Sequence, residues 1–163
     1  MAAEQFYRDL EPALAVAQRA GNKPRVRAIH AKIKHRRGDF LHKLSRRLVA
    51  EHGAIFVGNV NAAALAKTRM SKSVLDAGWS QFRTMLSYKC DAAGAWFLEV
   101  NEAYSTQTCS VCKARSGPKG IAGLGIREWQ CGVCATVHDR NVNAAKNILA
   151  VGRHRLAEGI FGL

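Results

Sequence analysis

The chain has 163 residues, 48% of them hydrophobic, which is enough to bury the core of a folded domain. Its 25 lysines and arginines outnumber 12 acidic residues, giving a formal net charge of +13. A field of that sign attracts polyanions such as nucleic acids. No apolar run reaches the ~18 residues that cross a bilayer, and the acidic N-terminus does not resemble a secretory signal. We therefore expect a cytoplasmic protein without membrane association, whose reduced cysteines favour metal binding over disulfides.

Residues 1–53 are expected to form a basic helical segment. Residues 2–20 are alanine-rich with one apolar stripe, and a turn at residues 21–24 precedes a second helix that ends near Gly53. Between residues 23 and 47 this second helix carries ten basic side chains against one acid, Asp39. A helix face that only had to stay soluble would carry charges of both signs, so we expect this face to contact phosphates. The side chains assigned to it are Arg25, Arg27, Lys32, Lys34, Arg36, Arg37, Lys43, Arg46 and Arg47.

Short apolar segments alternate with helices in the remainder of the chain. Residues 54–57 and 95–100 read as strands, a helix between them ends near Ala93, and another runs from Asp139 to about residue 151. This alternation predicts an α/β fold. Its core would combine residues 54–102 with residues 139–152, leaving residues 153–163 as a basic, then apolar, tail.

Residues 103–138 contain four cysteines in the spacing Cys109-x2-Cys112-x18-Cys131-x2-Cys134. Two such pairs form a recognised zinc pattern, because each short turn directs two sulfurs at one ion. Four thiolates fill the tetrahedron, so we expect a structural Zn²⁺ in a zinc ribbon, with a redox disulfide pair as the alternative. His138 is a second, less favoured ligand candidate.

Several motifs occur in a distinctive order. They are DFLHKLS at residues 39–45, LDAGW at 75–79, FRTMLSYK at 82–89, YSTQTCSVC at 104–112 and DRNVNAAKNI at 139–148. Over about residues 25–155 the chain resembles the C-terminal half of the OrfB/TnpB family. These proteins are encoded by insertion sequences, were long described as transposases, and are RNA-guided DNA endonucleases related to type V CRISPR effectors.

The resemblance implies the C-terminal part of a RuvC-like nuclease domain of the ribonuclease H fold, with the zinc ribbon inserted before its last helix. Such nucleases hold two divalent ions with carboxylates from separate segments. Asp139 matches the family's third acid and is also suited to cap a helix. Gly58, followed by Asn59, stands where the family has a glutamate, and the first acid belongs to an upstream segment. Mg²⁺ is therefore expected only if the nuclease site is completed.

Three functions remain open at this point. The favoured one is a nuclease-deficient, transposon-associated protein of a prokaryotic nucleoid that contributes to binding DNA or, as the resemblance implies, a guide RNA. The second is a working part of an endonuclease that another chain completes, and the third is an inactive truncated product. Two spare acids near the second strand, Glu99 and Glu102, do not match the family's motif, and Glu99 is the one that could in principle replace the missing glutamate. The sequence makes no prediction of oligomeric state.

Overall fold

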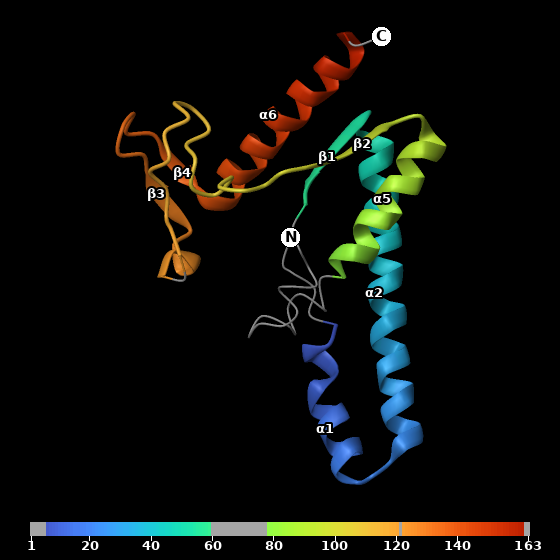
Figure 1. Cartoon of the computed structure of the whole chain (residues 1–163). Helices are drawn as coiled ribbons and strands as arrows, with labels where there is room; N and C mark the ends of the chain where they lie inside the picture. Colours follow the sequence, from blue (N-terminus) through green and yellow to red (C-terminus); the bar gives the residue numbers. More distant parts are fainter. Residues whose placement is uncertain (1–5, 60–77, 121, 162–163) are drawn as a thin grey trace. The chain divides into compact units, whose positions relative to one another are not determined.

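The computed structural model describes residues 6–59, 78–120 and 122–161. The fold mixes helices with short strands and divides into two compact units, Met1–Ile55 with Asn61–Phe97 and Phe56–Val60 with Leu98–Leu163. Within the described residues, no helix is long and apolar enough to cross a membrane. The elements, labelled as in Figure 1, are η1 (Arg8–Leu10), α1 (Glu11–Arg19), α2 (Lys23–Glu51), β1 (Ala54–Gly58), α5 (Trp79–Ala93), β2 (Trp96–Val100), η2 (Ala122–Gly125), β3 (Glu128–Gln130), β4 (Val137–Asp139) and α6 (Arg140–Phe161).

The first unit begins with a helical hairpin formed by α1 and α2 (Figure 1). Gly21 adopts a φ of +62° in the connecting turn, a conformation that glycine reaches without strain. Asn22 then caps α2, because its side chain accepts a hydrogen bond from the Arg25 amide at 3.0 Å. The predicted helix that ends near Gly53 is confirmed as α2. The apolar side chains of the hairpin form a core of Phe6, Leu14, Ala17, Ile29 and Ile33.

Helix α5 packs against α2 through a polar contact as well as an apolar face. Lys89 Nζ donates to the His42 carbonyl at 2.8 Å and to Ser45 Oγ at 2.6 Å. Burial, followed by the charge of Arg46, lowers the pKa of Lys89. The next residue, Cys90, is fully buried and lies outside the group of four cysteines.

β1 and β2 confirm the two strands expected from the sequence and pair in a two-stranded sheet. The Trp96 amide donates to the Gly53 carbonyl at 2.8 Å, and the Asn59 amide donates to the Val100 carbonyl at 2.9 Å. Because both bonds join corresponding ends of the strands, the pairing is parallel. The carboxyl ends of β1 and β2 therefore lie beside each other.

Helix α6 approaches β1 closely at one glycine. A Cβ built on Gly152 would collide with the ring of Phe56 and lie 2.8 Å from its Cβ. Gly152 is buried in the middle of α6. The absence of a side chain there lets the helix backbone rest directly on the strand.

Candidate metal centre and nucleic-acid interface

The two cysteine turns have the same backbone conformation. In each, the amide of the first cysteine donates to the carbonyl five residues later, from Cys109 to Ala114 at 2.8 Å and from Cys131 to Thr136 at 2.9 Å. In each, the residue four positions after that cysteine has a positive φ, 66° at Lys113 and 58° at Ala135. The repeated turn directs both sulfurs of each pair to the same side.

The four sulfurs meet at one point. Those of Cys109, Cys112, Cys131 and Cys134 all lie within 4.8 Å of one another. The separations are 3.7 Å between Cys109 and Cys134 and 3.6 Å between Cys112 and Cys131. A tetrahedral ion with Zn–S bonds of ~2.3 Å requires sulfurs about 3.8 Å apart. The residues therefore form a group that could hold a metal ion, and their spacing fits zinc.

The surroundings of the sulfurs favour thiolates at two positions. A hydrogen bond from the Cys134 amide, then ones from the Ser116 hydroxyl and the Val133 amide, lower the pKa of Cys131 to about 5. The hydroxyl and then the amide of Thr136 lower the pKa of Cys134. At Cys112 the Ala114 amide lowers the pKa, but desolvation and the three neighbouring cysteines outweigh it and raise the pKa to about 12. Four adjacent thiolates repel one another, so a bound cation is what makes the fully deprotonated set stable.

One side of the sulfur cluster is covered by Trp129 and His138. These residues are directly paired across the β3–β4 ladder, both are buried, and their rings lie 4.7 Å apart. His138 Nε2 is 3.1 Å from Cys109 Sγ. The histidine thus lies within hydrogen-bonding distance of one sulfur, while the four cysteines already supply a complete tetrahedron.

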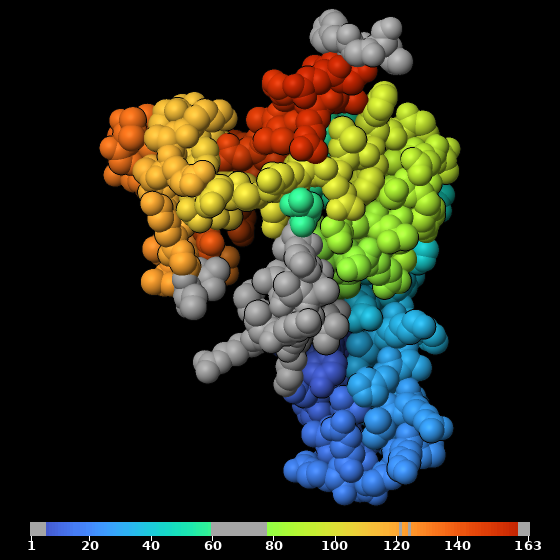
Figure 2. Space-filling view, in the orientation of Figure 1, coloured from blue at the N-terminus to red at the C-terminus, as the bar shows by residue number. Residues whose placement is uncertain are grey.

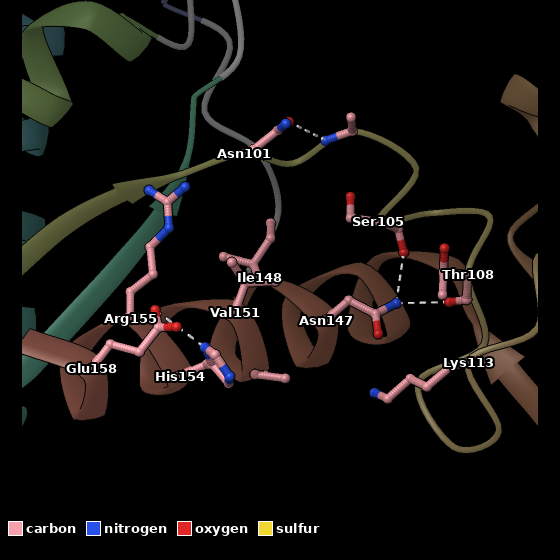
Figure 3. Close-up of a pocket in the computed structure, with 12 residues that line it drawn as sticks. Asn101, Ser105, Thr108, Lys113, Asn147, Ile148, Val151, His154, Arg155 and Glu158 are labelled. Atoms are coloured by element: carbon pink, nitrogen blue, oxygen red, sulfur yellow. Dashed lines mark hydrogen bonds and ion pairs between the residues drawn. The ribbon is translucent and has the colours of Figure 1, made fainter.

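Hydrogen bonds from helix α6 hold the backbone on either side of Cys109. The side-chain amides of Asn143 and Asn147 both donate to the carbonyls of Ser105 and Thr108, at 2.7 to 3.2 Å. Asn143 Oδ1 in turn accepts from the Ser110 amide at 2.9 Å. Figure 3 shows the Asn147 bonds at one end of a cavity of about 470 Å³ between α6 and the segment after β2. Order at the metal centre is therefore coupled to order in α6.

Asp139, expected from the resemblance to be one of the nuclease acids, ends β4 and is exposed. Its Oδ1 accepts from the Val142 amide at 2.8 Å, which confirms the helix-capping role expected for it. Within the described ranges, the four cysteines are the one group of three or more His, Cys, Asp or Glu side chains close enough to share an ion. No carboxylate cluster therefore surrounds Asp139 in this part of the chain.

At the end of β1, the space beside Gly58 is filled by Glu102. A Cβ built on Gly58 would collide with the Glu102 carboxylate and lie 2.8 Å from its Cβ and 2.9 Å from its Cδ. The Glu102 amide also donates to Asn59 Oδ1 at 3.3 Å. Glu102 is one of the two spare acids near the second strand, and it lies here in place of Glu99, the acid considered as a replacement from the sequence. The parallel register is the signal that locates Glu102, because Asn59 pairs with Val100, two residues before Glu102.

The basic side chains assigned to nucleic-acid contact lie along α2, and eight of the nine are exposed. Arg25, Lys32, Arg36, Lys43 and Arg47 follow at intervals of seven and four residues, which places them on one stripe of the helix. Part of the α2 surface is visible in blue and cyan in Figure 2.

Lys43 and Arg37 of the basic set both make contacts within the chain. Lys43 forms an exposed ion pair with Asp39 at 2.7 Å. Arg37 is half-buried, and its side chain lies under Gly78 at the start of α5. Arg37 therefore belongs to the packing between α2 and α5 more than to the exposed stripe.

Two family models match the chain. Residues 10–69 match a model described as "Probable transposase", and residues 79–148 match one described as "Cas12f1-like, TNB domain". A protein of Streptomyces pristinaespiralis with the provisional name of RNA-guided DNA endonuclease is 39% identical over 83% of this chain. The chain belongs to the OrfB/TnpB family. A relative from Escherichia coli, InsQ, with the same provisional name, is 30% identical over 84% of the chain.

The chain matches only part of each of these proteins. It spans 33% of the Streptomyces relative and 37% of InsQ. A solved structure described as the Cas12f1–sgRNA–target DNA complex matches 91% of this chain and 42% of that one, with a TM-score of 0.69 at 13% sequence identity. The fold is therefore like that of Cas12f1 over the matched part.

Proposed function

We propose that the chain is a nucleic-acid-binding member of this transposon-associated family, with an incomplete nuclease site. In this proposal the strands and α6 form the C-terminal part of a RuvC-like core, residues 103–138 form a zinc ribbon, and residues 1–53 form a basic helical segment. DNA is the expected partner, and a guide RNA is the second candidate. The expected location is the cytoplasm, at the nucleoid. Zn²⁺ held by the four cysteines would stabilise the ribbon and, with no open position, would not take part in hydrolysis.

The exposed basic stripe of α2 is the observation that carries the proposal. Its five cations extend over residues 25–47, about 33 Å along a helix. That length is close to the ~34 Å of one duplex turn. Side chains arranged in this way can neutralise successive phosphates along a backbone and displace condensed counterions. The binding would be largely independent of sequence, because phosphates carry no base identity.

Salt dependence tests this directly. The purified chain is titrated into fluorescently labelled duplex DNA and single-stranded RNA, and anisotropy is followed from low to physiological salt. The proposal expects affinity to fall steeply, with a slope of log affinity against log salt near −0.9 for each duplex phosphate neutralised. An affinity that stays flat over that range would refute binding through phosphates.

A second candidate is a nuclease part that another polypeptide completes, and Glu102 favours it. Its carboxylate lies where a side chain at Gly58 would be, so it can supply the acid that the glycine lacks. Together with Asp139 and an acid from an upstream segment, it would hold Mg²⁺. The metal would activate water and stabilise the leaving oxygen.

Complementation separates the candidates. The chain is mixed with the upstream part of the Streptomyces relative and that system's guide RNA, and cleavage of target DNA is measured. The second candidate expects cleavage that disappears in Glu102→Ala and persists in Glu99→Ala. DNA binding without cleavage supports the first candidate, and neither binding nor cleavage indicates an inactive product.

A further inference from the structure

The turn between β2 and the first cysteine holds a tyrosine in an unusual conformation. Tyr104 has a φ of 64°, a left-handed region in which a bulky aromatic residue is a marked outlier. The conformation is imposed by the turn, because the Tyr104 carbonyl accepts hydrogen bonds from the amides of Gln107 and Thr108, both at 2.9 Å. Glycine or asparagine would make the same turn with less strain. The aromatic side chain at this position therefore costs stability, and such strain is concentrated at functional sites.

The Tyr104 side chain does not recover that cost by burial. It remains 50% exposed. The Arg115 guanidinium lies over its ring, with Cζ 3.5 Å from the ring centroid, and Arg115 is itself exposed. Arg115 is held in place by its bridge to Thr108, which immediately precedes Cys109 of the four-cysteine group. The result is a surface pair of two flat groups that lies beside the four-cysteine group and is open to solvent.

The chemistry of this pair suits a nucleobase. Unpaired bases stack on aromatic rings and on arginine guanidinium planes, and any base can do so because each has a π-face. The surrounding ribbon is basic, since residues 103–138 carry four basic side chains, Lys113, Arg115, Lys119 and Arg127, against one acid, Glu128. Bases inside a duplex have no free face to offer, so the ligand must be single-stranded.

We propose that Tyr104 and Arg115 form a stacking platform for one base of a single-stranded nucleic acid. The platform deepens the proposed nucleic-acid binding by adding a contact to a base, in a different unit of the chain from the phosphate-binding stripe on α2. It distinguishes single strands from duplexes, which the stripe does not do.

Strain and function can be separated with two substitutions. Tyr104→Gly removes the ring and suits the positive φ, so the variant should melt at the same or a higher temperature. Its affinity for an unstructured 12-nucleotide oligothymidylate should fall roughly 5- to 100-fold, the range that stacking of one base supports. Tyr104→Phe keeps the ring and should bind like the unsubstituted chain. Tyr88→Ala, which removes a tyrosine that is 47% exposed on α5, serves as the matched control.

An abasic oligonucleotide of the same length completes the test. It keeps the phosphates and lacks the bases, so the proposal expects Tyr104→Gly and the unsubstituted chain to bind it equally. Equal binding of the oligothymidylate by both proteins would overturn the platform while leaving phosphate binding intact. A persistent difference on the abasic strand would also overturn it, by showing that the ring acts without a base. If the unsubstituted chain binds no nucleic acid at all, the proposed function fails together with the platform.

Discussion

Loss of the metal should unfold the ribbon, because the ribbon has little else to stabilise it. Its buried cluster consists of Cys109, Trp129 and Cys131, two of which belong to the four-cysteine group that could hold the metal. Burying one large apolar side chain contributes about 3 kcal/mol at most, whereas a structural zinc site contributes on the order of 10 kcal/mol. The Cys131→Ser substitution, or a strong chelator, should therefore disorder residues 103–138. The start of α6 should loosen with them, because its asparagines hold the backbone around Cys109.

Elemental analysis and hydrogen exchange measure this outcome. The purified chain should contain one zinc per molecule, and its ribbon amides should be protected. In Cys131→Ser the zinc should be lost and protection should fall in the ribbon and at Asn143 and Asn147. The matched control is Cys90→Ala, which removes a buried cysteine outside the metal site and should keep both zinc and ribbon protection. A purified protein without metal, or a Cys131→Ser variant with unchanged exchange, would refute the reasoning.

Five further substitutions test the packing and the charged surface. Gly152→Ala should destabilise the protein by about 1–3 kcal/mol, because its new methyl group has no room against β1. Gly159→Ala on the same helix, where nothing lies within 4 Å of the new methyl group, should stabilise the protein by about 1 kcal/mol. Thermal melting compares the two variants. Equal melting temperatures would contradict the close approach of α6 to β1. Gly58→Ala should cost about 1–3 kcal/mol in urea unfolding, since the space is occupied, and an unchanged midpoint would contradict this. Arg36→Ala should reduce the steepness of the salt dependence by about 0.9, whereas Arg37→Ala should lower the melting temperature and leave the salt dependence unchanged.

The features that the sequence predicted correctly depend on local patterns. The cysteine spacing identifies the metal group because each turn is set by a few consecutive residues. The apolar intervals along residues 23–51 identify α2 because helical periodicity is a property of neighbouring residues. The capping role of Asp139 likewise depends on an amide only three residues away.

The features that it missed depend on contacts between distant residues. Glu102 reaches Gly58 through the register of two parallel strands, which no local pattern encodes. The sequence places Arg37 among the basic side chains of the helix, whereas the structure shows its side chain packed against the start of α5. The strain at Tyr104 is equally invisible in sequence, because tyrosine gives no sign of a positive φ. These three positions are where the structure adds most to the functional interpretation.

We expect the chain to bind nucleic acid and, by itself, not to cut it. The most direct measurement incubates end-labelled single- and double-stranded DNA with Mg²⁺ or Mn²⁺ at a protein concentration that saturates binding. We predict shifted but intact DNA, because two-metal hydrolysis requires several carboxylates and the described residues bring no such cluster to Asp139. Cleavage by the unsubstituted chain that disappears in Asp139→Ala would contradict the claim and show that the chain is a nuclease on its own.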